Sequence, residues 1–157
     1  MNITASQTVN TKPNFASPTD GFIRDSFESH LREELNSLGV TIPAVQSRTT
    51  KELAVMKEDK VVAYISRKTA IKSGQLVVCL HPRFAKLIDA AIAAEPNIQI
   101  RPGRQSRYIS SSNYRGFESK GWTKEIDTNE HIAVAYTVTP SADLSELKSL
   151  LQARLAY

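Results

Sequence analysis

The chain of 157 residues has 41% hydrophobic and 23% charged residues and a formal net charge of +4, which is typical of a globular protein and excludes wholesale disorder. Its longest apolar runs, QLVVCL and IDAAIAA, are too short to span a bilayer, and the N-terminus lacks a secretory signal. We therefore predict a cytoplasmic protein with no membrane partner. The one cysteine, Cys79, lies in an apolar run, so we expect a buried, inert thiol.

Positive charge is concentrated in the middle of the chain. Residues 1–59 hold six lysines and arginines against eight acids, and residues 125–157 hold two against five. Between them, residues 60–124 hold twelve lysines and arginines against three acids. A separation of charge on this scale produces a directed field, which affects the choice of partners more than it affects folding.

The N-terminal half is predicted to form a tail, a helix and a strand hairpin. Residues 1–20 are polar and rich in Ser, Thr and Asn, which is typical of a flexible tail, and we expect one globular domain over residues 21–157. The helical spacing of apolar residues in GFIRDSFESHLREELNSLG predicts a helix that ends at Gly39. The stretch ELAVMKEDKVVAYIS predicts two strands joined by a tight turn over residues 58–60.

The second half is predicted to alternate strands and helices. GQLVVCLHP is apolar on both faces, as a central strand would be, and PRFAKLIDAAIAAEP predicts a helix with Pro82 in its first turn. NIQI, RYIS and HIAVAYTV are strand-like, and SADLSELKSLLQARL predicts an amphipathic helix capped by Ser141 or Asp143. The sequence thus predicts an α+β fold in which three helices pack on a mixed, largely antiparallel sheet of five or six strands.

The sequence shows no catalytic or metal-binding motif. His30 falls on the polar side of the first predicted helix, His81 ends a strand and His131 begins one, each without a second ligand at metal-binding spacing. We expect His81 to bond a backbone group at the turn into the second helix. Glu58 and Lys60 resemble the acid and lysine of a metal-dependent nuclease, but they fall where the turn is expected. We therefore predict no catalytic residue, no metal and no cofactor.

The basic segment RPGRQSRYISSSNYRGF is the strongest functional candidate. Its arginines can bond phosphates bidentately, its glycine lets a ligand approach the backbone, and its tyrosines can stack on bases or support the loop. Basic residues of the neighbouring hairpin and of the second helix would add to the field. The predicted nucleic-acid-binding residues are Arg101, Arg104, Arg107, Tyr108, Tyr114 and Arg115, with Lys68, Lys72 and Arg83 as secondary contacts.

Between about residues 60 and 117, the chain resembles proteins of the YjbR-type (double-wing) family. The resemblance rests on VVAYISRK, GQLVVCLHP, the helix over residues 83–95 and IRPGRQSRY. Tyr108 and Tyr114 stand where the family has His and Trp, and residues 118–139 have no clear counterpart. The resemblance implies an α+β fold and DNA binding, and it transfers no catalytic residue.

These observations favour a non-enzymatic domain that binds DNA or RNA through the basic loop. This interpretation requires the arginines to project together from one edge of the molecule and to be free of internal carboxylates. A protein-interaction or accessory module, such as an inhibitor or an immunity-type partner, would instead bind an acidic surface, and the acidic ends and basic centre could join in a homo-oligomer. A metal-dependent nuclease would use Glu58 and Lys60.

Overall fold

The computed structural model describes residues 21–44, 51–67, 75–103, 107–117 and 132–157. Several residues named above lie outside the described ranges. These are the predicted tail over residues 1–20, His131, and the binding candidates Lys68, Lys72 and Arg104.

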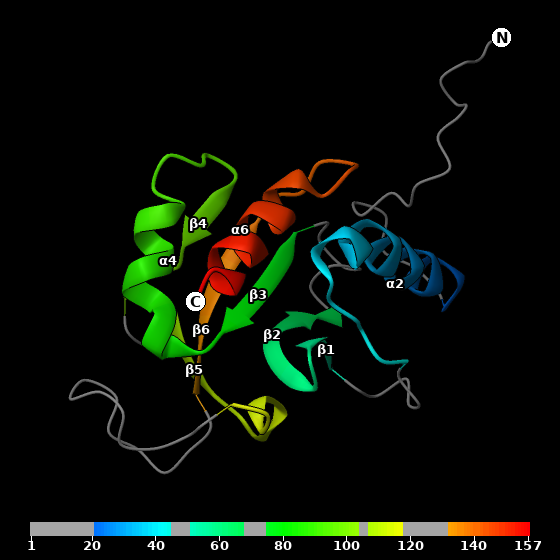
Figure 1. Cartoon of the computed structure of the whole chain (residues 1–157), viewed down its shortest axis with the longest axis horizontal. Helices are drawn as coiled ribbons and strands as arrows, with labels where there is room; N and C mark the ends of the chain where they lie inside the picture. Colours follow the sequence, from blue (N-terminus) through cyan, green and yellow to red (C-terminus); the bar gives the residue numbers. More distant parts are fainter. Residues whose placement is uncertain (1–20, 45–50, 68–74, 104–106, 118–131) are drawn as a thin grey trace, which may run out of the picture.

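Six strands form one antiparallel sheet (Figure 1). The strands are β1 (Glu52–Lys57), β2 (Lys60–Ser66), β3 (Leu76–Leu80), β4 (Ile98–Ile100), β5 (Tyr108–Ser110) and β6 (Ile132–Val138). They lie in the order β1-β2-β3-β6-β4, and β5 pairs with the same edge of β6 as β4 does, beyond the end of β4. Every pairing in the described part of the chain is antiparallel. The predicted α+β fold is confirmed, and β3 is a central strand.

β1 and β2 meet in a two-residue turn, as predicted. Lys57 pairs with Lys60, and between them Glu58 and Asp59 have φ values of 51° and 66°. Positive φ at both central residues gives the turn a twist that matches that of the two strands. Thr41 exchanges two backbone hydrogen bonds of 2.8 Å with Met56, on the other edge of β1.

Three helices cover one face of the sheet (Figure 1). They are α2 (Gly21–Leu35), α4 (Ala85–Ala91) and α6 (Ser145–Leu155). Each contributes fully buried side chains, among them Leu31, Ile88 and Leu150, to a core that includes Val78 and Tyr136 of the strands. Apolar residues at helical spacing thus face alternate residues of the strands, which confirms the predicted amphipathic helices. Among the described residues, no helix has the length and apolar character needed to cross a membrane.

A short segment covers part of the other face. The 3₁₀ turn η3 (Ser112–Tyr114) leads to Phe117, and Tyr114 and Phe117 are only 4% and 5% exposed. Their rings lie 5.4 and 5.1 Å from the ring of Tyr64. Beneath them the Cys79 thiol donates a 3.4 Å hydrogen bond to the Tyr114 hydroxyl. Burial raises the pKa of Cys79 to about 12, so this thiol is buried and protonated, as expected.

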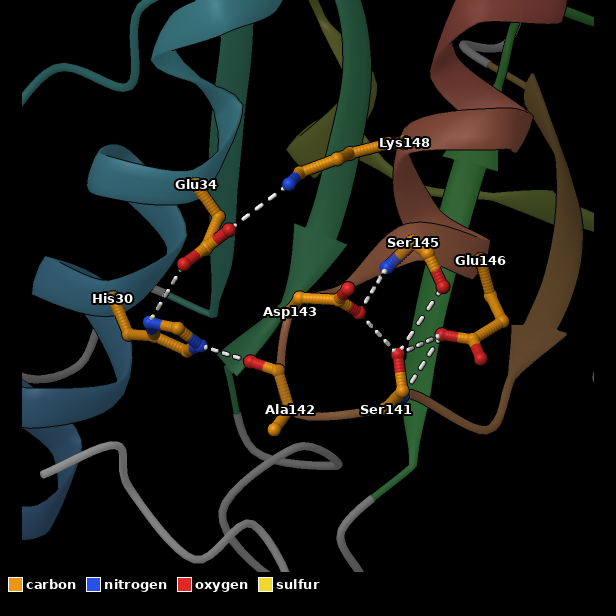
Figure 2. Close-up of polar contacts among 8 residues, drawn as sticks. All are labelled: His30, Glu34, Ser141, Ala142, Asp143, Ser145, Glu146 and Lys148. Carbon is orange, nitrogen blue, oxygen red and sulfur yellow. Dashed lines mark hydrogen bonds and ion pairs between the residues drawn. The ribbon is translucent and has the colours of Figure 1, made fainter. Parts of the chain in front are cut away.

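A polar network fixes α2 against the chain that leads into α6 (Figure 2). The Nε2 atom of His30 lies 2.6 Å from the carbonyl oxygen of Ala142, and Lys148 Nζ donates a 2.9 Å hydrogen bond to Glu34 Oε1. His30 is only 5% exposed, so its expected place on the polar side of the helix is wrong. The segment before α6 packs over that side and supplies the carbonyl partner.

Acidic side chains hold the start of α6 to the segment before it (Figure 2). Asp143 Oδ1 accepts hydrogen bonds from the Ser145 amide at 3.2 Å and from the Ser141 hydroxyl at 2.7 Å. These bonds lower the pKa of Asp143, because they stabilise its ionised form. Glu146 Oε1 accepts from the Ser141 amide at 2.8 Å. The N-cap residue of α6 is Leu144, which makes no side-chain cap, and Asp143 just before it bonds the amide of the first helical residue, Ser145.

Candidate anion-binding site

Arg107, one of the predicted phosphate ligands, is held inside the protein. Its Nη2 atom donates to both carboxylate oxygens of Asp89 on α4, at 2.6 and 2.8 Å, and lies 3.2 Å from the Tyr136 hydroxyl. The Tyr136 hydroxyl in turn donates to Asp89 at 2.8 Å. The Arg107 side chain is only 16% exposed. This guanidinium therefore already has a carboxylate partner on the helix-covered side of the sheet.

Arg101 lies on the opposite face. It lines a pocket with Val77 and Thr137, whose side chains lie on the face that Tyr114 and Phe117 partly cover. Arg101 follows β4 directly and Arg107 directly precedes β5. The two described arginines of this loop therefore do not project together, and the expectation of one continuous patch is not met for them.

The aromatic residues of the predicted loop pack against the two core layers. Tyr108 is half-buried against the core under the helices. Tyr114 is buried in the smaller core on the opposite face of the sheet. Burial is the main reason that the pKa of Tyr114 is raised, and the neighbouring Cys79 adds to the shift. Tyr114 therefore supports the loop rather than offering an open ring for stacking. Arg115, which follows it, is exposed.

A cationic pocket of about 390 Å³ lies at the end of the sheet that carries the β1–β2 turn. Lys60 of the turn, Arg83 of the 3₁₀ turn η2 (Pro82–Phe84) and Arg154 of the last turn of α6 all line it. Asp59 is the one carboxylate among the described residues that line this pocket. We call this site the cationic pocket: it is formed by Lys60, Arg83 and Arg154, together with the ring of Phe84 that both arginines contact.

Both guanidinium groups of the cationic pocket lie over the ring of Phe84. The centre of the Arg154 guanidinium is 4.0 Å from the ring centroid, and that of Arg83 is 5.0 Å from it. Burial and the positive charge of Arg83 lower the pKa of Arg154. The Nε atom of Arg154 is shielded from solvent and has no hydrogen-bond partner among the described residues. A bound anion would offset the repulsion between these two like charges.

The wall of the cationic pocket is built by close packing. His81 Nδ1 accepts a 3.1 Å hydrogen bond from the Arg83 amide, which confirms the expected bond at this turn and fixes the backbone that carries Arg83. The Gly116 amide donates a 3.0 Å hydrogen bond to the Tyr64 hydroxyl. A Cβ atom at Gly116 would lie 2.6 Å from that hydroxyl oxygen and 2.7 Å from a methyl of Val61. Only glycine therefore lets the chain at position 116 lie this close to β2.

Two residues of the cationic pocket were not among the predicted ligands. Lys60 is a candidate only in the nuclease hypothesis, and Arg154 lies in the last predicted helix, for which the sequence suggests no binding role. The charge density of residues 60–124 pointed to Arg83 and Lys60 but not to Arg154, which lies outside that region. The sequence does not show that α6 packs against α4, which brings Arg154 beside Phe84 of η2.

Two other groups of polar residues lie outside the candidate site or only partly in it. His30, Glu33 and Glu34 lie close enough together to hold a cation, but Glu34 is already bonded to Lys148 and His30 to a carbonyl. Glu58 and Lys60, the nuclease candidates, flank the exposed turn of the hairpin. The first group therefore serves to join two helices, whereas the Lys60 ammonium belongs to the cationic pocket.

Comparisons with known proteins add no assignment. No protein-family model, curated protein or solved structure matches this chain. The resemblance to YjbR-type proteins therefore stays a prediction.

Proposed function

We propose that the protein binds DNA or RNA without catalysing a reaction, and that the cationic pocket holds a backbone phosphate. The supporting observation is the gathering of Lys60, Arg83 and Arg154 around one cavity with a single described carboxylate. Guanidinium groups bond phosphate oxygens in pairs, and a phosphate would relieve the repulsion between the two arginines.

The surroundings of the cationic pocket suit a polymer rather than a lone anion. Lys86 on α4 and Arg115 after η3 are exposed; Lys86 follows Phe84 of the pocket by two residues, and Arg115 directly precedes Gly116. A phosphodiester chain passing through the pocket would therefore meet further positive charge close by. Each neutralised phosphate releases counterions, which makes such binding fall steeply with salt.

The proposal is tested with the double variant R83Q/R154Q and a fluorescein-labelled 12-nucleotide RNA of mixed sequence. We expect affinity to fall at least tenfold at low salt, and the slope of log affinity against log salt to become shallower by about 0.7, since the variant loses one phosphate contact and single-stranded nucleic acid loses about 0.7 per contact. Anisotropy titrations between low and moderate salt measure both quantities.

A control of equal charge change separates this pocket from general attraction. K51Q/K148Q also removes two positive charges, and neither residue lines the pocket. Its affinity should stay within about twofold of the wild type. Equal losses in both variants would mean that net charge alone retains the RNA. If R83Q/R154Q bound like the wild type, the pocket would not be the phosphate site, and binding to an acidic protein would become the better hypothesis.

A further inference from the structure

A second pocket, of about 400 Å³, lies on the sheet face opposite the three helices. Its two charged members are Glu52 and Arg101, and Ser66, Val77 and Thr137 are among the residues between them. Tyr114 lines this pocket, whereas Gly116 and Phe117 line the cationic pocket. The segment over residues 114–117 therefore separates the two pockets and touches both.

Glu52 gives this pocket a hydrogen-bond acceptor that the protein does not satisfy. Its Oε1 atom is shielded from solvent and has no hydrogen-bond partner among the described residues. Burial raises the pKa of Glu52 to about 7, and the neighbouring Lys51 opposes the shift. A shielded carboxylate oxygen without a donor is costly, so a ligand that brings N–H groups to it would be favoured.

Arg101 stands on the far side of the same pocket. Glu52 pairs with Ser66 across β1 and β2, and Thr137 of β6 pairs with Val77 of β3 and with Gln99 of β4, two residues before Arg101. Four strand spacings and two residues along the chain therefore separate the backbones of Glu52 and Arg101, about 20 Å in all, and both side chains line the pocket between them. Unlike Arg107, Arg101 forms no ion pair with a described acid.

The pocket thus has a hydrogen-bond acceptor at one end, a cationic donor at the other and a mixed polar and apolar lining between them. Among the nucleobases, guanine presents two adjacent N–H donors on one edge and the O6 and N7 acceptors on another. Adenine and cytosine place an acceptor beside their amino group, and uracil flanks its one N–H with two carbonyls. A carboxylate can accept two bonds from guanine alone, and arginine bonds O6 and N7 of guanine in pairs.

We propose that this second pocket binds a guanine base, with Glu52 accepting from N1–H and the 2-amino group and Arg101 donating to O6 and N7. The inference rests on the proposed function, because it supplies base preference to a protein whose phosphate contacts come from the cationic pocket. The base would have to be unpaired, since Watson–Crick pairing uses the edge that Glu52 reads.

The test compares uridine heptamers that carry guanine, inosine or adenine at the central position. We expect guanine to bind about tenfold more tightly than adenine, and inosine, which lacks the 2-amino group, to fall between them. In E52Q the difference between guanine and inosine should disappear, while affinity for the all-uridine heptamer should stay unchanged. Equal affinities for the three heptamers, or an unchanged preference in E52Q, would overturn the proposal.

A second probe makes the result independent of phosphate binding. Guanosine carries no phosphate, so it cannot be held by the cationic pocket. In ¹H–¹⁵N spectra of the full chain, guanosine but not adenosine should shift the amides of Glu52, Ser66 and Thr137. No shift with guanosine would overturn the guanine pocket. Loss of heptamer binding in R83Q/R154Q without any guanine preference would leave the proposed function standing and remove this inference alone.

Discussion

Arg107 shows that local charge density does not decide where a charge acts. The segment around it has no acid in the sequence, yet its guanidinium meets Asp89, which lies 18 positions earlier on α4. The pair is completed by the Tyr136 hydroxyl beneath it. A residue that reads as a phosphate ligand in sequence is therefore a link between a helix and the sheet edge.

Replacing Arg107 should affect stability rather than binding. In R107M the half-buried Asp89 keeps, among the described residues, only the Tyr136 hydroxyl as partner, so we expect a loss of about 1–3 kcal/mol in the free energy of unfolding. Urea unfolding measures this change. Affinity for the 12-nucleotide RNA should match that of the wild type. A variant with normal stability and weakened RNA binding would show that Arg107 does contact the ligand.

Glu52 predicts a pH dependence of stability. Its pKa rises from 4.5 to about 7 in the folded protein because burial disfavours the charged form. The folded state then binds the proton more tightly than the unfolded state, so stability falls as pH rises from about 4.5 to about 7 and is constant for this group above that. E52Q should remove this fall, which is of the order of 2 kcal/mol. Urea unfolding at pH 5 and pH 8 compares the two proteins, and an equal pH response in both would contradict the assignment.

At the scale of elements, a buried ion pair joins α2 to β2. Arg67 Nε donates a 2.6 Å hydrogen bond to Glu28 Oε2, and both residues are only 6% exposed. The two residues lie 39 positions apart in sequence, so the pairing depends on how the first helix docks. Breaking such a pair leaves an uncompensated buried charge, which costs more than removing both partners.

A double-variant comparison tests this link. R67M should lower the free energy of unfolding by about 3–5 kcal/mol, because Glu28 stays buried without its partner. E28M/R67M removes both charges at similar volume and should recover a large part of that loss. Thermal unfolding of the two variants and of E28M gives the comparison. Additive losses in the double variant would mean that the pair contributes no coupling.

The elements that were predicted correctly are those with local causes. The turn between β1 and β2 needs only two residues that tolerate positive φ, and the helix that ends before Gly39 needs only its own apolar stripe. β4 and β5 were harder to separate, because both are three residues long and owe their existence to pairing with β6. The burial of Tyr114 has the same origin, since Tyr64 and Cys79 belong to distant strands.

At the scale of the whole molecule, the cationic pocket is assembled from three distant parts of the chain. The start of β2, the 3₁₀ turn η2 and the end of α6 each bring one positive side chain. Sequence could supply the excess of charge and the candidate Arg83, but it could not supply Arg154, because only the packing of α6 beside α4 places it there. The part of the site that was foreseen is its charge, and the part that was not is its geometry.

The two edges of the sheet have a consequence for how copies of the protein meet. At one edge of the sheet, Thr41 hydrogen-bonds to Met56 of β1. At the other edge, β4 and β5 are two short strands that pair with separate parts of β6. Within the described ranges, neither side therefore offers a long uninterrupted row of free amides and carbonyls. Such rows are templates for aggregation, so interrupted margins protect this sheet from adding strands of a neighbour.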